Sequence, residues 1–336
     1  MTQLSLFFLG RFQVTLAGKP LVTFESDRVR ALLAFLAVEA DRPHRRDQLA
    51  ALFWPNHPEA TARANLRHVL RKLRQALGEV ENAPAWLLTT RQTIQFNPAS
   101  PYTLDVARFQ ELRALCQAHP HPDPSACVAC AERLNQAVAL YEGNFLAGLS
   151  LPGSIALEEW VLLNQERLHR QAVAILTHLA NYHETHGNFE LAATLTRRQV
   201  ELEPWREEAH RQLMRVLAAA GQRRAALAQY ESCCRILAAE LGVEPTPETT
   251  ALYERIRVGG LDRGNALQVS PAPLPLRSPT IDWGEAPPSG AFYGRQAELA
   301  RLERWLITER CRLVALLGMG GIGKTSLAAH LARSLA

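Results

Sequence analysis

A spacing of 34 residues recurs in the middle of this 336-residue chain and limits what that part can fold into. Four pairs of similar or identical residues are separated by this distance: Gly187 and Gly221, Ala192 and Ala226, Leu179 and Leu213, and Leu202 and Ile236. Tetratricopeptide repeats (TPR) have this period, with small residues where paired helices cross and glycine in the turn between them. We therefore expect residues 105–258 to form an all-α domain of TPR-like helical repeats. Such arrays are mostly protein-binding scaffolds, so catalysis is not expected there.

The first 104 residues show a different pattern. Residues 4–24 alternate between apolar and polar side chains and break at a turn over residues 17–20, which predicts a hairpin or small sheet. Three helical patterns follow, in ESDRVRALLAFLAVEADRP, HRRDQLAALFWPN and PEATARANLRHVLRKLRQALGE, and WLLTTRQTIQF then indicates two strands joined by a tight turn. Strands, three helices and a terminal hairpin predict a winged helix-turn-helix domain of the α+β class over residues 1–104.

The third of these helices has an unusual distribution of charge. Its apolar stripe holds Leu66, Val69, Leu70, Leu73 and Leu77, and its opposite face holds Thr61, Ala64, His68, Arg71 and Gln75, with Arg67 and Lys72 beside them. Residues 60–77 contain five Lys or Arg and no acidic residue, whereas solvated helical faces usually mix both signs. This pattern favours a recognition helix for the DNA major groove. A basic solvated helix is the alternative.

Basic residues outside this helix extend the candidate DNA-binding set. Arg45 and Arg46 begin the second helix, where side chains meet the DNA backbone, and Arg91 lies at the hairpin tip, from which it could enter a minor groove. Residues 1–100 hold 13 Lys and Arg against 8 Asp and Glu, and the other 236 hold 24 against 25. The positive charge of the front part suggests a polyanion such as double-stranded DNA as partner. The candidate residues are Arg45, Arg46, Thr61, Arg63, Arg67, His68, Arg71, Lys72 and Arg91.

A second motif stands near the end of the chain, where GMGGIGKT spans residues 318–325. The pattern G-x-x-x-x-G-K-T between an apolar strand and a helical run is that of a P-loop, whose backbone N–H groups surround phosphates while the threonine ligates Mg²⁺. The alternative is a chance glycine-rich turn. The motif predicts a site for ATP or ADP with Mg²⁺ at Gly318, Gly320, Gly321, Gly323, Lys324, Thr325 and Ser326.

Only eleven residues follow Thr325, too few to supply the acidic metal ligand and water-positioning group of a P-loop enzyme. We therefore expect residues 291–336 to be the incomplete start of an α/β nucleoside triphosphatase domain in a longer protein. Residues 259–290 hold six prolines and no periodicity, which indicates a linker. The fold class is thus multidomain and mainly α, and this fragment is not expected to be an enzyme.

Cysteine and histidine cluster between residues 116 and 130. The order Cys116-x-x-His119-x-His121 followed by Cys127-x-x-Cys130 resembles structural zinc sites, in which two chain segments each present two ligands. The intervening segment has little apolar material, which a metal could replace. Cys116, His119, Cys127 and Cys130 are the expected ligands, with His121 a bystander. The alternatives are coincidental cysteines in a loop and a C-x-x-C dithiol.

Composition indicates the kind of cellular compartment in which the protein works. Apolar residues make up 47% of the chain and charged residues 21%, values that are ordinary for soluble globular proteins. The longest apolar run, residues 31–38, is too short to span a bilayer, and the N-terminus lacks the features of a signal peptide. Six cysteines over this length do not indicate a secreted disulfide scaffold. We expect a cytoplasmic protein with no membrane partner.

The order of these parts resembles the Streptomyces antibiotic regulatory protein (SARP) family. LGRFQV, RALLAFLA, RRDQLAALFWP and ARANLRHVLRKLRQALG resemble that family's OmpR-type winged helix. ALYEGNFLAGL, LEEWVLLNQERLHRQA and AAELGVEPTPETTALYERI resemble its bacterial transcriptional activation domain, and FYGRQAELARLERWL with the P-loop resembles the start of a signal-transduction ATPase with numerous domains (STAND). TTRQTIQF lacks the Gly-Tyr pair common in the family's wing, and residues 116–134 are an insertion relative to it.

This resemblance implies a transcriptional activator that binds direct repeats near a promoter as a dimer and recruits RNA polymerase. It also implies that an ATPase switch follows the linker. An alternative is a signalling ATPase whose winged helix and TPR-like repeats bind protein partners rather than DNA.

Overall fold

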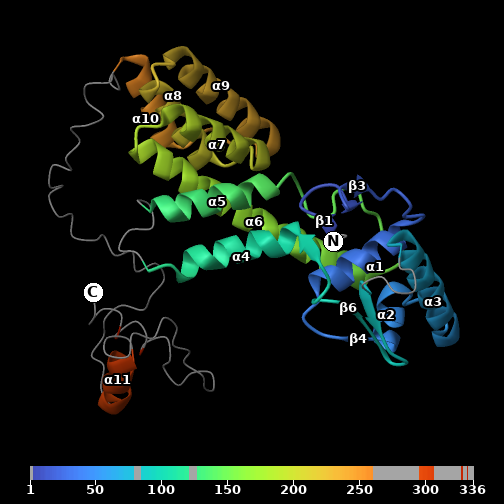
Figure 1. The fold of residues 1–336 in the computed structure, drawn as a ribbon. Helices are drawn as coiled ribbons and strands as arrows, with labels where there is room; N and C mark the ends of the chain where they lie inside the picture. Colours follow the sequence, from blue (N-terminus) through green and yellow to red (C-terminus); the bar gives the residue numbers. More distant parts are fainter. Residues whose placement is uncertain are drawn as a thin grey trace. The chain divides into compact units, whose positions relative to one another are not determined.

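A computed structural model describes residues 3–78, 85–120, 127–259 and 295–305, together with Leu327 and Leu331. The chain divides into two units, residues 1–268 and residues 269–336, each considered by itself. The first unit is mainly helical with two small sheets near its N-terminus (Figure 1).

The first sheet combines strands from the beginning and the end of residues 1–104, which we call the front part or N-terminal part. Its strands are β1 (Leu4–Phe7), β2 (Gln13–Leu16), β3 (Lys19–Pro20) and β7 (Tyr102–Leu104), in the order β3-β2-β1-β7. The sheet predicted for residues 4–24 is confirmed, and its two-residue turn is formed by Ala17 and Gly18, which both have positive φ. The sequence pattern did not predict that β7 pairs parallel to β1.

The predicted three helices and hairpin are also present. The helices are α1 (Asp27–Val38), α2 (Arg46–Phe53) and α3 (Glu59–Ala76), and the second sheet contains β4 (His44–Arg45), β5 (Leu87–Thr89) and β6 (Thr93–Phe96), in the order β4-β6-β5. The leucine stripe of α3 is buried as expected, with Leu73 and Leu77 fully inaccessible. Strand β4 takes up two residues that the sequence assigned to the second helix.

Helices α4 to α10 make up the rest of the first unit, and each of them packs against the next along the chain. Figure 1 shows α4 and α5 leaving the N-terminal part side by side, with α7 to α10 stacked beyond them. Their bounds are α4 (Asp105–Ala118), α5 (Val128–Leu140), α6 (Ile155–Thr185), α7 (Phe189–Leu202), α8 (Glu207–Ala219), α9 (Arg223–Glu240) and α10 (Pro247–Arg257).

The 34-residue spacing recurs in the backbone geometry. Gly187 ends the turn after α6 with φ 74° and Gly221 the turn after α8 with φ 78°, a region that residues with a Cβ rarely adopt. In both turns the following N–H bonds to the carbonyl five residues earlier, at 2.8 Å from Asn188 and at 2.8 Å from Gln222. The two turns therefore close α6–α7 and α8–α9 in the same way.

Backbone hydrogen bonds join the first sheet to the helical part. The segment after α5 donates to the chain after β1, with Glu142 N to Leu9 O, Leu146 N to Phe8 O and Ala147 N to Gly10 O all at 2.8 Å. Gly10 has φ 147°, and a Cβ there would lie 3.3 Å from the Cβ of Glu142. Glycine is thus required for this close approach of two segments more than 130 residues apart.

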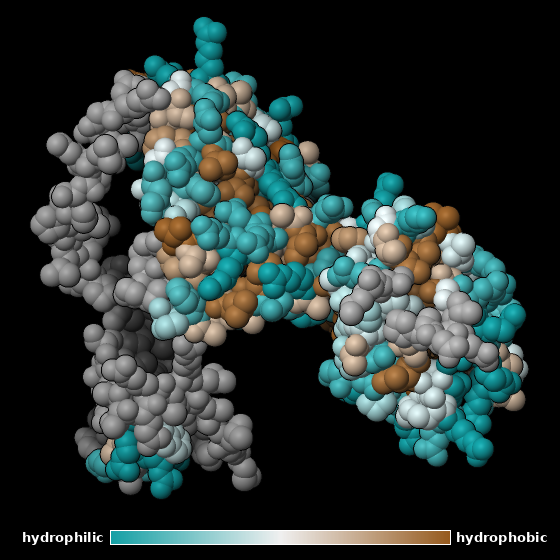
Figure 2. All heavy atoms as spheres, viewed as in Figure 1, coloured by the Kyte–Doolittle hydropathy of each residue, from teal (hydrophilic) through white to brown (hydrophobic). Residues whose placement is uncertain are grey.

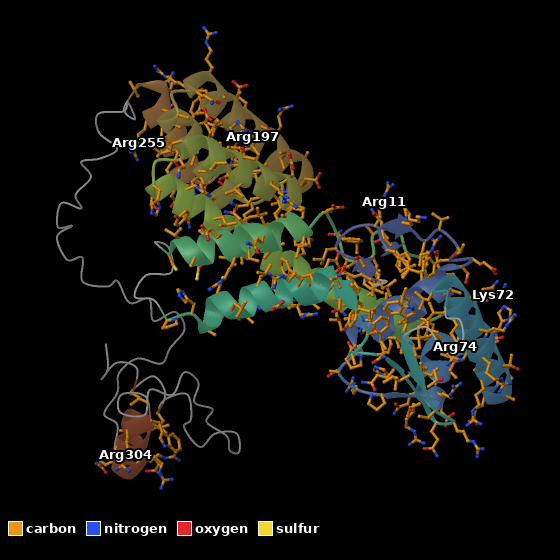
Figure 3. The ribbon with its side chains drawn as sticks, in the orientation of Figure 1. Arg11, Lys72, Arg74, Arg197, Arg255 and Arg304 are labelled. Carbon is orange, nitrogen blue, oxygen red and sulfur yellow. The ribbon has the colours of Figure 1, made fainter. Side chains whose placement is uncertain are left out.

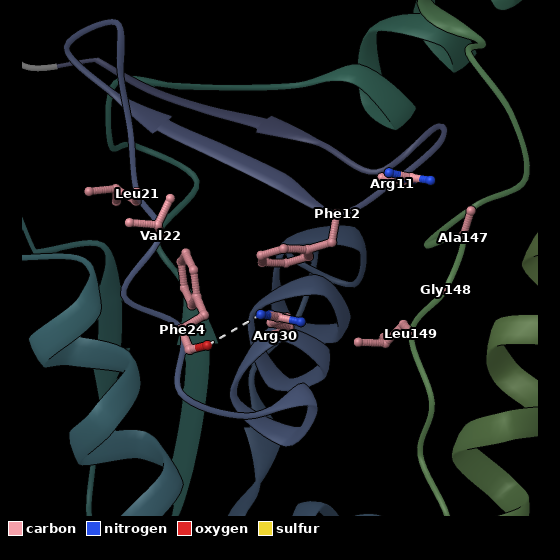
Figure 4. A pocket seen from close by; sticks show the side chains of 9 residues that line it. All are labelled: Arg11, Phe12, Leu21, Val22, Phe24, Arg30, Ala147, Gly148 and Leu149. Atoms are coloured by element: carbon pink, nitrogen blue, oxygen red, sulfur yellow. Dashed lines mark hydrogen bonds between the residues drawn. The ribbon is translucent and has the colours of Figure 1, made fainter.

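Side-chain contacts also connect the front part to the helical part; together with the backbone hydrogen bonds they form what we call the joint. The ring of Trp160 on α6 lies 5.1 Å from that of Phe35 on α1, and its Nε1 donates to the Glu39 carboxylate at 3.1 Å. Figure 4 shows a hollow whose lining comes from both sides: Phe12, Phe24 and Arg30 belong to the N-terminal part, and Ala147, Gly148 and Leu149 to the segment after α5. The front part and the first helices of the helical part therefore share one continuous core.

A buried carboxylate stands at the centre of this joint. Asp105, the first residue of α4, accepts hydrogen bonds from the N–H groups of Phe8, Leu9 and Val106, each at 2.7 Å. Burial raises the pKa of Asp105 to about 6, although the three N–H groups favour the charged form.

The second unit is described only in part. Helix α11 (Gln296–Glu303) contributes Leu302 to a small apolar cluster with Leu327 and Leu331, against which Leu299 and Trp305 pack. Among the described residues of the chain, no helix is both long enough and apolar enough to cross a membrane.

We expect the stability contribution of Asp105 to depend on pH. Its folded pKa of about 6 lies above the usual unfolded value near 3.9, so the stabilisation is fully present below about pH 4 and is lost as pH rises through 6. The unfolding free energy of the wild type relative to Asp105→Asn should fall by about 2–3 kcal/mol over this range. Urea unfolding followed by tryptophan fluorescence at pH 4.5 and 7.5 measures it. A difference independent of pH would show that Asp105 is charged throughout.

Candidate nucleic-acid interface

Three segments that are distant in sequence meet at one edge of the N-terminal part: the start of α2, the first half of α3 and the turn between β5 and β6. Together they surround a hollow with a strongly basic lining. Side chains tipped with nitrogen project from this edge and along α3, where Lys72 and Arg74 are marked (Figure 3). The residues that line the hollow are Arg45, Arg46, Asp47, Arg63, Leu66, Arg67, Thr90, Arg91 and Gln92.

Hydrogen bonds fix the start of α2 against the hairpin turn. Arg46 donates from Nε to the carbonyl oxygen of Thr90 at 3.0 Å, and its backbone N–H donates to the carbonyl of Gln92 at 2.8 Å. On the other side of the hairpin, Arg74 of α3 donates to Oγ1 of Thr89 at 2.5 Å. The three segments are thereby held in one arrangement without any ligand.

The hairpin turn is shaped by a threonine rather than by glycine. Oγ1 of Thr90 accepts hydrogen bonds from the backbone N–H groups of Gln92 at 3.1 Å and Thr93 at 2.9 Å. Such a side-chain turn closes the hairpin locally and leaves Arg91 exposed at its tip. This explains how the turn forms without the Gly-Tyr pair common in the resembled family.

The arginine side chains at this edge are only partly neutralised by carboxylates. The pKa of Arg46 is lowered, first by burial and then by the positive charges of Arg74 and Arg67. Within the described part of the chain, Arg45, Arg46, Arg67 and Arg91 form no ion pair with a carboxylate. Like charges held together in this way favour a bound polyanion.

Residues 60–77 contain no acidic residue, but two basic residues of α3 pair with acids from outside this window. Arg63 forms ion pairs with Glu59 at 2.6 Å and with Asp47 at 2.9 Å, and Lys72 pairs with Glu25 at 2.8 Å. Glu59 precedes the window of residues 60–77, and the other two acids come from separate segments. Because their side chains are mostly well exposed, these pairs are weak and can be exchanged for other partners.

The remaining predicted residues lie on the exposed side of α3. Thr61, His68 and Arg71 are exposed, and Nη2 of Arg71 lies 3.4 Å from Nδ1 of His68. Figure 2 shows hydrophilic residues along this edge of the N-terminal part. Arg74, Thr90 and Gln92 were not predicted, although Arg74 stands seven residues after Arg67 and so two helical turns further along the same side.

The predicted metal ligands are brought together at another place, where α4 ends and α5 begins. His119, Cys127 and Cys130 form a group whose ligand atoms all lie within 4.8 Å of one another. Cys116 lies beside them, with its Sγ 3.7 Å from the carbonyl oxygen of Cys130. His121 lies outside the described residues.

The predicted nucleotide site is not described by the structure. Its residues Gly318, Gly320, Gly321, Gly323, Lys324, Thr325 and Ser326 all lie outside the described residues. The P-loop therefore stays a prediction.

Comparison with known proteins places this geometry in context. Residues 104–257 match the family described as the bacterial transcriptional activator domain. The chain is 30% identical over 345 residues to regulatory protein AfsR of Streptomyces griseus, covering 94% of this chain and 31% of AfsR. It is 28% identical over 261 residues to transcriptional regulatory protein EmbR of Mycobacterium tuberculosis, covering 74% of this chain and 62% of EmbR.

A solved structure of Mycobacterium tuberculosis EmbR in complex with a low-affinity phosphopeptide is also similar. Its TM-score is 0.56 at 25% identity, and the match covers 77% of this chain and 66% of that one. The chain spans about a third of the length of the AfsR proteins that it matches. Residues 104–257 thus resemble a bacterial transcriptional activator domain, and the chain is similar to the regulatory proteins AfsR and EmbR over most of its length, in line with the resemblance to the SARP-type regulators.

Proposed function

We propose that this chain is a transcriptional activator that binds double-stranded DNA through the edge formed by α2, α3 and the β5–β6 hairpin. The observation that carries the proposal is that Arg45, Arg46, Arg67 and Arg91 gather from three separate segments and have no carboxylate partner among the described residues. Residues 1–104 then act as a winged helix-turn-helix domain, with α3 as recognition helix and the hairpin as wing.

The chemistry of the edge suits this role. A helix fits the major groove of B-DNA, and arginine can bond bidentately to guanine there. Arg67 and Arg71 on the exposed side of α3 are placed for such contacts. Arg45 and Arg46 at the start of α2 are suited to phosphates, and Arg91 at the hairpin tip to the neighbouring groove. The names of the relatives, a regulatory protein and a transcriptional regulatory protein, support a role in the regulation of transcription.

The helical part takes the role of protein contact. The repeated turns at Gly187 and Gly221 support TPR-like packing of α6 to α9, and such arrays bind proteins on their surfaces. We propose RNA polymerase as the partner of this part, with two copies of the chain on direct DNA repeats in the cytoplasm. The predicted P-loop, with ATP or ADP and Mg²⁺, would add nucleotide control.

A protein-binding role for the basic edge is the competing function. Its support is that Arg63 and Lys72 are already neutralised by acids of the same chain, which reduces the positive field. Salt dependence separates the two functions, because each phosphate neutralised contributes about −0.9 to the log–log slope of DNA affinity against salt.

We expect Arg67→Ala to weaken binding to a specific promoter duplex by about 1–3 kcal/mol if this residue reads a base bidentately. Arg255→Ala, which removes an exposed arginine from α10, is the matched control and should bind as the wild type does. Fluorescence anisotropy on upstream DNA and on scrambled duplex, each at two salt concentrations, measures both. Equal losses on the two duplexes would restrict Arg67 to phosphate contact, and no salt-dependent binding to any duplex would favour the protein-binding function.

Asp47→Asn should have the opposite effect. The substitution removes a negative charge from the lining of the hollow and frees Arg63 from one of its two ion pairs. DNA affinity at low salt should therefore rise several-fold, and the gain should shrink at high salt as screening increases. The same anisotropy assay tests it. Unchanged or weaker DNA binding by a folded Asp47→Asn protein would place the DNA elsewhere.

We also expect this chain to hydrolyse ATP no faster than its Lys324→Ala variant. A phosphate-release assay at saturating ATP and Mg²⁺ makes the comparison. Turnover by the wild type that disappears in Lys324→Ala would show that the catalytic groups are present after all.

A further inference from the structure

Two sulfur atoms face the same ring nitrogen at the junction of α4 and α5. Nδ1 of His119 lies 3.6 Å from Sγ of Cys127 and 3.4 Å from Sγ of Cys130. Cys116 adds a third thiol, with its Sγ 3.7 Å from the carbonyl oxygen of Cys130 and its side chain in contact with that of Cys130. Four residues from two segments thus converge on a small volume.

These separations match the edges of a tetrahedral zinc site. With Zn–S near 2.3 Å and Zn–N near 2.0–2.1 Å, tetrahedral geometry places sulfur and nitrogen about 3.6 Å apart. Hydrogen bonding alone explains the arrangement less well, because one imidazole nitrogen has a single lone pair and two thiols point at it. We propose that Cys116, His119, Cys127 and Cys130 bind a structural zinc ion.

The local secondary structure presents the ligands in pairs. Cys116 and His119 are three residues apart at the end of α4, and Cys127 and Cys130 are three apart at the N-cap and in the first turn of α5. Each pair thus combines one helical residue with one cap residue of extended backbone, Cys116 with His119 and Cys130 with Cys127.

The apolar packing at this end of the helix pair is thin. Leu115 of α4 is 46% exposed and Val128 of α5 is 57% exposed, whereas Phe109 and Tyr141 near the opposite end are fully buried. In Figure 1 the end of α4 and the start of α5 lie at the end of the helix pair that is away from the N-terminal sheets. A bound zinc ion would fasten the two helix ends where side-chain burial does not.

Elemental analysis of the full-length chain without an affinity tag tests the proposal. Protein purified in zinc-containing buffer should hold about one zinc ion per chain. The Cys127→Ser/Cys130→Ser variant should lose it, whereas Cys234→Ser, which alters a partly exposed cysteine on α9, should retain it. Folded wild-type protein without zinc, or a double variant that keeps its zinc, would overturn the site.

Cobalt identifies the ligands independently of the zinc count. Wild-type protein stripped with a chelator and loaded with Co²⁺ should show the intense absorption of tetrahedral cobalt and sulfur-to-cobalt charge transfer. His119→Ala should reduce this signal and His121→Ala should not; the reverse result would assign the wrong histidine and overturn the ligand set. If the double cysteine variant fails to fold, this assay decides, because folded, stripped wild type that does not take up Co²⁺ excludes the site.

A disulfide between Cys127 and Cys130 is the remaining alternative. The described cysteines are all free, and thiol titration of denatured protein purified without reductant distinguishes the two cases. Six titratable thiols support the zinc site. Four thiols with a Cys127–Cys130 link found by peptide mapping would overturn it.

Discussion

The carboxylate of Asp105 connects the two ends of the front part and the first long helix beyond it. Asp105 lies where β7 ends and α4 begins. Its carboxylate accepts hydrogen bonds from the backbone N–H groups of Phe8 and Leu9, just after β1. A buried acceptor at this position satisfies donors that would otherwise lack partners in the core. The parallel pairing of β1 with β7 and the start of α4 therefore depend on the same side chain.

This joint fixes the basic edge relative to the helical part. The close approach of Gly10 to the segment after α5, and the contact of Trp160 with Phe35 and Glu39, extend the attachment to α1, the helix that packs on α3. A regulator that binds DNA with α3 and a protein with α6 to α9 would hold the two surfaces in a defined relation. A bound promoter could then position the helical part through the shared core rather than through a flexible linker.

Local sequence patterns were sufficient to predict the helices and strands. They were not sufficient to predict which distant segments these elements contact. The leucine stripe of α3 and the hairpin could be predicted because they repeat every 3.6 or 2 residues. The four residues of the proposed metal site could be found for a similar reason, since two pairs of Cys or His residues three apart leave a recognisable spacing in the sequence. Strand β7, the Arg63–Asp47 pair and the Arg74–Thr89 bond join segments with no shared periodicity, so only the folded chain reveals them.

Acidic residues pair with α3 at two positions, and the unpaired basic surface of the helix lies between them. Glu59 and Asp47 hold Arg63 near the start of the helix, and Glu25 holds Lys72 two to three turns later. Between them, Arg67 and Arg71 have no carboxylate partner within the described residues. A phosphate backbone would be attracted most strongly to this middle stretch and less strongly at its ends, because the ion pairs there reduce the positive charge. The paired residues would then set the register of α3 on a duplex, and the unpaired ones would supply the binding.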